Sequence, residues 1–470
     1  MSFRPMFRGI QRHGMVTLLL AYILACSLFG GASRYWLEVH AILQVTAATG
    51  IALLILSWPS ETRLTRLKVP IGLLSSVLVL TTLQIVPLPS SIWTLLPGRE
   101  LILEGYDSLG VEPGALPISL DLEASLQSIG YALTPLFVIL LAVRTGASSL
   151  LRVVPVFLCG LGVISVLIGL SQVYAGQDLT LYFYDNTNFG FPVGAFANVN
   201  HFGSLLLMIF PFAIVLFQQA PKRRSDIGAQ VSMMATALAV LLFLCIGIVA
   251  AGSLAVYLMF VPVLIASLMS PQKGTKWGGG NRLLMAVLMG VILLVLIIVL
   301  SSPVLDGLGV TGASDNPTSR QNMWLFTLNA IDTYWPLGTG AGTYESVIPQ
   351  FEDQDTVSTR YIALAHNEFL QILVEFGVLG ACLVIAGVIW FANLVRTIMF
   401  KKCVDSNHAF QRAAVMGMVV CLCHSFVDYP ARTPAIASIL AVYVAIASLP
   451  LRPMTSLDHR KLQDPKRLVL

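Results

Sequence analysis

Charged residues are scarce in this chain: only 11% of its 470 residues are Asp, Glu, Lys or Arg. A soluble domain contains about 25%. Hydrophobic residues make up 56% of the chain, and they gather in runs long enough to cross a bilayer as helices. The runs lack the short alternation that strands of a membrane barrel would have. The composition therefore excludes a soluble enzyme and predicts an all-α polytopic membrane protein.

The apolar runs predict about 12 transmembrane helices. The count is open by one or two, because only a short "AAGS" turn divides the stretch 230–270. The runs lie at about 15–32, 39–58, 69–87, 125–143, 153–173, 200–219, 230–250, 252–270, 283–302, 366–394, 410–428 and 433–450.

Basic residues are nearly missing from one side of the predicted membrane. With a cytoplasmic N-terminus, all but five of the 28 Lys and Arg residues fall on the cytoplasmic side, as the positive-inside rule requires. This bias predicts an even number of spans and two cytoplasmic ends. The net charge of +4 thus reflects topology, and we expect no nucleic-acid partner. The outward-facing basic residues are Arg34, Arg99, Arg320, Arg360 and Arg432.

Several kinds of site lack support in the sequence. The seven cysteines all fall in predicted spans or on the cytoplasmic side, which argues against a disulfide framework. Cys421, Cys423 and His424 lie together in an apolar helix, where small packing residues are a better interpretation than a zinc site. The Gly-rich "PLGTGAGTY" has no lysine and no preceding strand, so it is not a P-loop. We expect no metal and no other cofactor.

Two outward-facing segments are long enough to form structure of their own within the single membrane domain. The first, 88–124, is rich in Pro and acidic residues. The second, 303–365, is the large outer loop predicted before the tenth helix, and residues from Ser319 to about Asp332 in it can form an amphipathic helix. Polar residues gather where these and neighbouring segments enter the membrane.

His366 is the first candidate site residue, because it precedes the tenth predicted span in "AHNEFLQILVEFG". A helix start has unpaired N–H groups and a positive dipole that attract anions such as phosphate, and histidine exchanges protons near neutral pH. The alternative is a hydrated histidine at the membrane interface. Glu368, Gln371 and Glu375 share one face of the same helix, so Glu375 either lines a cavity or bonds another span. Asn367 completes this candidate site.

Arginines and a second helix start supply the other candidates. Arg320 and Arg432 could each clamp phosphate oxygens. The alternatives are an ordinary surface charge for Arg320, and an interface residue pairing with Asp428 for Arg432. Asn198, Asn200 and His201 precede the sixth span, where they could cap the helix or bind sugar hydroxyls. His201 is a weaker candidate base than His366.

Three motifs in this order resemble the bacterial O-antigen ligase and O-antigen polymerase superfamily. They are "FANVNHFGSLLLMIFP", "SRQNMWLFTLNAIDTYWPLGTGAGTY" and "AHNEFLQILVEFGVLG". The resemblance covers about 20–450, including "QIVPLPSSIWTLLPG", and its ligase-like region spans about 195–390. The "HN" and "E-x-G" signature is specific in combination.

The resemblance implies a GT-C-like fold and an inverting, metal-independent glycosyltransferase in the bacterial inner membrane. Such enzymes take a glycan from an undecaprenyl-diphosphate carrier on the periplasmic side. Polymerases pass it to another carrier-linked acceptor glycan, and ligases pass it to lipid A–core; a chain-length regulator protein would be a further partner. By motif, Arg320 is similar to the arginine that contacts the diphosphate, and His366 to the histidine that activates the acceptor hydroxyl or assists departure of the diphosphate.

One departure from the family pattern leaves ligase against polymerase open. Family ligases carry an arginine after a serine on a central span, whereas Leu254 follows Ser253 here. Arg432 could supply that charge instead, and the change favours polymerisation slightly. The rival function is a polysaccharide flippase or permease without chemistry. One observation argues against a transporter: the polar residues cluster at one membrane face rather than at the bilayer midplane.

Overall fold

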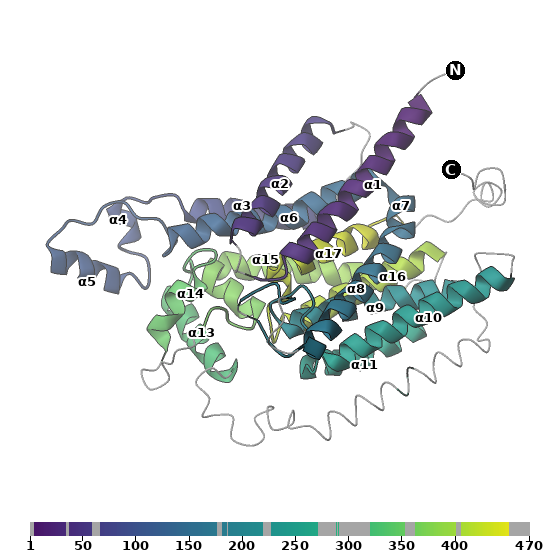
Figure 1. Cartoon of the computed structure of the whole chain (residues 1–470). Helices are drawn as coiled ribbons and strands as arrows, with labels where there is room; N and C mark the ends of the chain where they lie inside the picture. Colours follow the sequence, from purple (N-terminus) through teal and green to yellow (C-terminus); the bar gives the residue numbers. More distant parts are fainter. Residues whose placement is uncertain are drawn as a thin grey trace.

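The computed structural model describes residues 4–33, 37–58, 66–175, 181–185, 187–219, 227–270, 288, 290, 320–352, 362–400 and 406–450 (Figure 1). These residues form helices and connecting loops, with one isolated β-bridge between Leu88 and Leu116, so the all-helical prediction is confirmed. The elements are α1 (Arg4–Phe29), α2 (Leu37–Leu56), α3 (Lys68–Gln84), α4 (Ser90–Trp93), α5 (Glu100–Leu109), α6 (Leu122–Thr145), α7 (Ala147–Arg152), α8 (Val154–Ala175), α9 (Val199–Gln219), α10 (Ile227–Ala250), α11 (Leu254–Met269), α13 (Arg320–Tyr334), α14 (Tyr344–Val347), η5 (Ile348–Phe351), α15 (Glu368–Met399), α16 (Ser406–His424), η7 (Pro430–Arg432) and α17 (Pro434–Ala447).

Helix α9 forms the centre of the bundle. It packs against α8, α10, α11 and α16. Of its most apolar 18-residue stretch, 83% is buried inside the protein. Small residues allow these close approaches: a Cβ on Gly203 would lie 2.4 Å from Val256 Cγ2. A second group of helices surrounds α6, which packs against α1, α2, α3 and α17. Contacts between α16 and α17 join the two groups.

The helix lengths fit a polytopic membrane protein. Within the described ranges, six helices are long and apolar enough to span a membrane, and four shorter apolar helices accompany them. Every predicted apolar run except 283–302 corresponds to a described helix; almost all of that run lies outside the described residues, so the count of twelve stays a prediction. The run predicted at 410–428 ends earlier than expected, because α16 stops at His424.

Helix α15 is broken near its start by the sequence that follows α13. Gly377 has a φ of 55° inside α15, a conformation that glycine adopts at little cost. The amide of Val378 donates to the Pro336 carbonyl at 2.8 Å, and the amide of Gly340 donates to the Glu375 carbonyl at 3.0 Å. The Gly-rich "PLGTGAGTY" therefore has a structural role: it bonds the α15 backbone groups that the break leaves without helical partners. We call this segment the wedge.

The two outward-facing segments have different structures. The segment 88–124 contains α4 and α5, which extend away from the bundle (Figure 1). In the segment 303–365, the predicted amphipathic helix is confirmed as α13, which packs against α15. Residues 303–319 and 353–361 of that segment lie outside the described part of the chain.

Candidate active site

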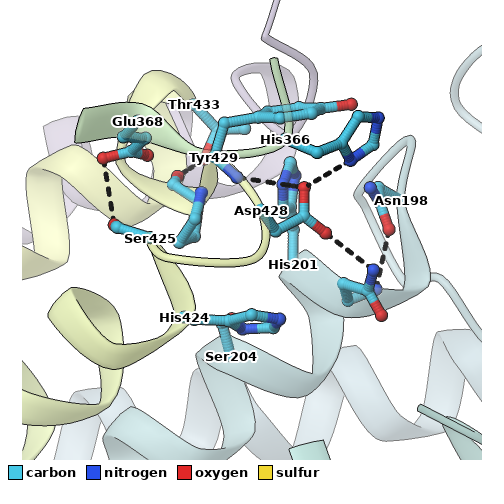
Figure 2. Close-up of polar contacts among 12 residues, drawn as sticks. Asn198, His201, Ser204, His366, Glu368, His424, Ser425, Asp428, Tyr429 and Thr433 are labelled. Atoms are coloured by element: carbon cyan, nitrogen blue, oxygen red, sulfur yellow. Dashed lines mark hydrogen bonds and ion pairs between the residues drawn. The ribbon is translucent and has the colours of Figure 1, made fainter. Parts of the chain in front are cut away.

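The carboxylate of Asp428 is the centre of a polar cluster at one end of the bundle (Figure 2). Asp428 lies in the loop after α16 and is fully buried. Its Oδ2 accepts a 2.6 Å hydrogen bond from Asn200 Nδ2 at the start of α9. Its Oδ1 accepts one of 3.0 Å from the Tyr429 amide. A buried carboxylate is stable only with such partners.

Two histidines from different segments face this carboxylate. His366 Nδ1 lies 3.4 Å from Asp428 Oδ1, and His201 Nε2 lies 3.7 Å from the same oxygen. The ring of Tyr429 packs edge-on against both imidazoles, with centroid distances of 4.8 Å to His366 and 5.1 Å to His201. The side chain of His201 is buried, whereas that of His366 is 27% exposed, so His366 is the histidine that a substrate can reach.

The electrostatics of the loop favour an ionised Asp428. Burial acts to raise the pKa of this carboxyl, but the hydrogen bonding and charges of His201 and His366 outweigh it and hold the pKa well below its usual range. The carboxylate therefore stays negative at neutral pH. A fixed negative charge beside Nδ1 favours the tautomer of His366 that carries its proton on Nδ1.

His366 also has an unusual backbone conformation. Its φ is 48°, and it is the one residue other than glycine with a positive φ among the described residues. A left-handed conformation at a side chain of this size costs free energy and often marks a functional position. The turn directs the chain from the loop into α15, and it holds the imidazole over the Asp428 loop.

The start of α15 differs from the open anion site expected from the sequence. Asn367 caps the helix, and its Oδ1 accepts from the amides of Phe369 and Leu370 at 3.1 Å each. The Glu368 amide donates to the Ser425 carbonyl at 2.9 Å. These amides are already paired, so the expectation that they would attract phosphate is wrong. Asn367 is a helix cap here.

Glu368 ties α15 to the loop that carries Asp428. One carboxylate oxygen of Glu368 accepts from the Ala431 amide at 2.8 Å. The other accepts from the Ser425 hydroxyl at 3.0 Å (Figure 2). These contacts fix the loop between α16 and α17 against the start of α15, and so fix Asp428 relative to His366.

Glu375 and Arg432 form a second, separate polar cluster. Arg432 donates from both terminal nitrogens to the Glu375 carboxylate, at 3.2 and 3.1 Å. Gln371 Nε2 donates to Glu375 Oε1 at 2.9 Å. The interpretation that Arg432 pairs with Asp428 is therefore wrong, and the interpretation that Glu375 bonds another segment is confirmed. Burial lowers the pKa of Arg432, but Glu375 and Glu368 raise it more, so the guanidinium stays charged.

Asn198 and Asn200 have structural partners at the start of α9. Asn198 Oδ1 accepts from the Asn200 amide at 2.8 Å, as the predicted helix cap requires. The side chain of Asn200 bridges two groups, because its Oδ1 also accepts from the Ser253 hydroxyl at 2.7 Å. Ser253 thus belongs to the Asp428 cluster, and Leu254, where family ligases have arginine, begins α11 directly beside it.

Arg320 begins α13 and is exposed. Helix α13 packs against α15, the helix that follows His366. Arg320 is thus joined to the region of His366 through α13, and it keeps a guanidinium accessible from outside. No group of three or more His, Cys, Asp or Glu suited to a metal ion occurs among the described residues.

Residues 238–385 match the family model described as O-antigen ligase. The match confirms the resemblance to the O-antigen ligase and polymerase superfamily. A search of curated proteins found no match to the chain. The matched segment contains Arg320, His366, Asn367, Glu368 and Glu375.

Several residues outside the matched segment lie against it in the structure. Asn198, Asn200 and His201 precede the segment, whereas Asp428 and Arg432 follow it. The sequence pointed to Asp428 only as a partner of Arg432 and not as a candidate site residue. The available signal was an acidic residue in "HSFVDYPARTPA", at the membrane face that also carries His201 and His366.

Proposed function

We propose that this protein is a membrane glycosyltransferase that moves a glycan from an undecaprenyl-diphosphate carrier to an acceptor glycan. It acts either as a polymerase or as a ligase onto lipid A–core. The observation that carries the proposal is the partly exposed His366 imidazole, 3.4 Å from the buried carboxylate of Asp428, in a chain with an O-antigen ligase segment.

The Asp428–His366 pair suits activation of an acceptor hydroxyl. With Nδ1 facing Asp428, Nε2 is the nitrogen that can accept the acceptor's proton. The carboxylate stabilises the imidazolium that results, as in other histidine–carboxylate pairs. The distance of 3.4 Å is long for a hydrogen bond, and such contacts often tighten only when substrate binds.

The transfer step needs one bond formed and one broken. The acceptor oxygen attacks the anomeric carbon from the face opposite the leaving group, and the bond from that carbon to the phosphate oxygen breaks. The proton of the acceptor hydroxyl passes to His366, and undecaprenyl diphosphate leaves with the bonding electron pair. The anomeric configuration is therefore inverted, and the step needs no metal.

Arg320 is the cation we assign to the leaving diphosphate. It is exposed at the start of α13, which packs against α15, the helix that follows His366. Positive charge aimed at a developing anion contributes strongly to catalysis. Arg432 is a weaker candidate, because both of its terminal nitrogens already bond Glu375. We assign Arg432 a structural role in holding the site together, and its charge acts on the diphosphate only at longer range.

The bias of basic residues supports the orientation. It favours cytoplasmic chain ends in the bacterial inner membrane and an active site on the periplasmic side. The partners are then the lipid-linked glycan, the acceptor glycan or lipid A–core, and a chain-length regulator protein. Transfer assays with defined sugar substrates determine the sugar identity and the linkage.

Reconstitution with purified lipid-linked glycan tests the proposal. Glycan transfer without ATP or added metal is expected from the wild-type protein. Arg320→Ala and His366→Ala should each abolish transfer while membrane insertion is kept. Movement of the lipid-linked glycan across the bilayer without any product would instead favour a flippase. Normal product ladders from both variants would rule out the assigned roles.

Deletion of the gene separates ligase from polymerase. Loss of glycan on lipid A with polymer still accumulating on the carrier is the ligase outcome. Loss of long polymer with single repeats remaining is the polymerase outcome.

A further inference from the structure

A cavity of about 300 Å³ opens between the first turns of α2 and the first half of α6. None of its residues takes part in the transfer step proposed above. Its lining contains a carboxylate, an imidazole, two carboxamides and a phenol ring. The lining residues are Glu38, His40, Ala41, Gln44, Gln127 and Tyr131.

His40 is the most informative residue in the cavity. Its side chain is buried, with 2% of its surface exposed, and neither ring nitrogen has a hydrogen-bond partner in the described part of the chain. The ring packs edge-on against Tyr131, with a centroid distance of 6.1 Å. A buried polar group without a partner costs free energy and calls for an explanation. A ligand hydroxyl in the cavity would supply the missing partner.

Gln44 is held at the cavity by a close approach of α2 to α6. A Cβ on Gly130 would lie 1.9 Å from Gln44 Oε1, so the lack of a side chain on α6 makes room for this carboxamide. Tyr131 is fixed as well, because its hydroxyl donates to the Ser33 carbonyl at 2.9 Å. The polar groups of the cavity are thus positioned before any ligand arrives.

The chemistry of the lining selects an uncharged, hydroxyl-rich ligand. The described lining residues include no Lys or Arg, and Glu38 would repel a phosphate. Carboxylates, carboxamides and imidazoles donate to or accept from hydroxyl groups, and the ring of Tyr131 offers a flat apolar face. The volume is at the small end for ligand pockets, which suits one sugar unit.

The cavity also neighbours the proposed active site. The Ser33 carbonyl that Tyr131 bonds lies two residues after Gly31, whose carbonyl accepts from the Ala197 amide at 3.2 Å, next to Asn198 at the start of α9. We propose that the cavity between α2 and α6 is a subsite for one uncharged sugar unit of a glycan substrate, an assignment that rests on the proposed transferase function. The sugar belongs either to the donor glycan or to the acceptor glycan, which present the same hydroxyl chemistry.

Two variants and a control on α2 test the subsite. His40→Leu and Gln44→Leu each remove polar groups from the cavity. Thr46→Val is the control, because Thr46 is exposed and its hydroxyl bonds the Ile42 carbonyl of its own helix. The assay measures kcat and KM in reconstituted vesicles, first with lipid-linked donor varied and then with acceptor varied.

We expect the KM for one glycan to rise about 3- to 10-fold in each cavity variant, the effect of about one hydrogen bond. The kcat should stay within about twofold, and the control should match the wild type. The substrate whose KM rises identifies the source of the sugar. The thermal midpoint of His40→Leu should not fall, because the substitution removes a buried polar group without a partner. Unchanged KM values for both glycans would overturn the subsite.

A binding measurement separates failure of the subsite from failure of the proposed function. Saturation-transfer NMR with the repeat-unit oligosaccharide, released from the host's own surface polysaccharide, needs no turnover. Signals that are present with the wild type and lost with His40→Leu support the subsite even if no transfer occurs. Equal signals with both proteins reject the subsite even if transfer is normal.

Discussion

The Asp428→Asn substitution isolates the charge at the centre of the site without changing its shape. The carboxylate accepts from Asn200 Nδ2 at 2.6 Å and from the Tyr429 amide at 3.0 Å. It also faces His366 Nδ1 and His201 Nε2. The asparagine side chain has one acceptor oxygen where aspartate has two. In either orientation, its NH₂ group therefore faces a donor, either Asn200 Nδ2 or the Tyr429 amide.

The size of the effect follows from the contacts that are lost. A hydrogen bond to a charged group contributes about 1.5–3 kcal/mol, and about 1.4 kcal/mol corresponds to a tenfold change in rate. If the His366 contact acts in the transition state, kcat should fall about 10- to 100-fold; the lower part of the energy range applies because 3.4 Å is a long contact. A buried donor without a partner should also cost about 1–3 kcal/mol of stability.

Transfer kinetics with saturating acceptor provide the assay, alongside thermal unfolding in the same detergent or lipid. The control is Asp121→Asn, which removes a carboxylate at the start of α6. Asp121 Oδ1 accepts from the Ala124 amide at 2.9 Å as a helix cap, and asparagine caps equally well, so this variant should keep wild-type kcat. A kcat for Asp428→Asn within twofold of the wild type would refute the role given to the carboxylate.

The lowered pKa of Asp428 also sets a pH dependence of stability. A carboxyl with a folded pKa below its unfolded value of about 3.8 stabilises the fold above that pH. That contribution disappears as the pH falls through the folded pKa. Between pH 7 and pH 5, Asp428 should therefore cause no change in stability. Below about pH 4, the difference in thermal midpoint between wild type and Asp428→Asn should shrink; a constant difference there would contradict the assignment.

Three further substitutions test other parts of the site. His366→Asn should lower kcat about 10²- to 10⁴-fold, the usual effect of removing a general base. Asparagine tolerates a positive φ, so the thermal midpoint should fall only by the loss of the contact with Asp428; a folded variant with normal kcat would exclude His366 as the base. Arg432→Lys should destabilise the protein by about 1.5 kcal/mol, because lysine loses the two-pronged contact with Glu375, and an unchanged midpoint would argue against that pair as a brace. Gly377→Ala should cost about 2 kcal/mol or more, because its Cβ would lie 2.0 Å from the Pro336 carbonyl oxygen at a φ of 55°. Gly387→Ala on the same helix meets nothing nearer than 3.9 Å and should be neutral; equal effects of the two would refute the wedge.

The helices were predictable because each depends on its own residues. A long apolar run in a bilayer has to form a helix, since lipid supplies no partners for its backbone. The ends of the helices were less predictable. The run predicted at 410–428 is apolar almost throughout, yet α16 stops at His424. The Ser425 hydroxyl then bonds Glu368 on α15, a contact that the local sequence does not contain.

The Gly-rich "PLGTGAGTY" and the "E-x-G" signature also looked independent in the sequence. In the structure they are one unit, because Pro336 and Gly340 bond the backbone on either side of Gly377. Neither motif by itself indicates a broken helix. The need for glycine at Gly377 comes from the backbone that packs against it.

The sequence by itself determined the membrane class, the helices and which polar residues stand at helix starts, including His366. Only the tertiary structure decided which of those residues act together. The contact between Asn200 and Asp428 joins positions 228 residues apart, and the choice of Glu375 over Asp428 as the partner of Arg432 depends on how α15 packs against the loop before α17. Hydropathy and spacing report the environment of one helix, whereas a charge selects its partner by distances that several packed helices set together.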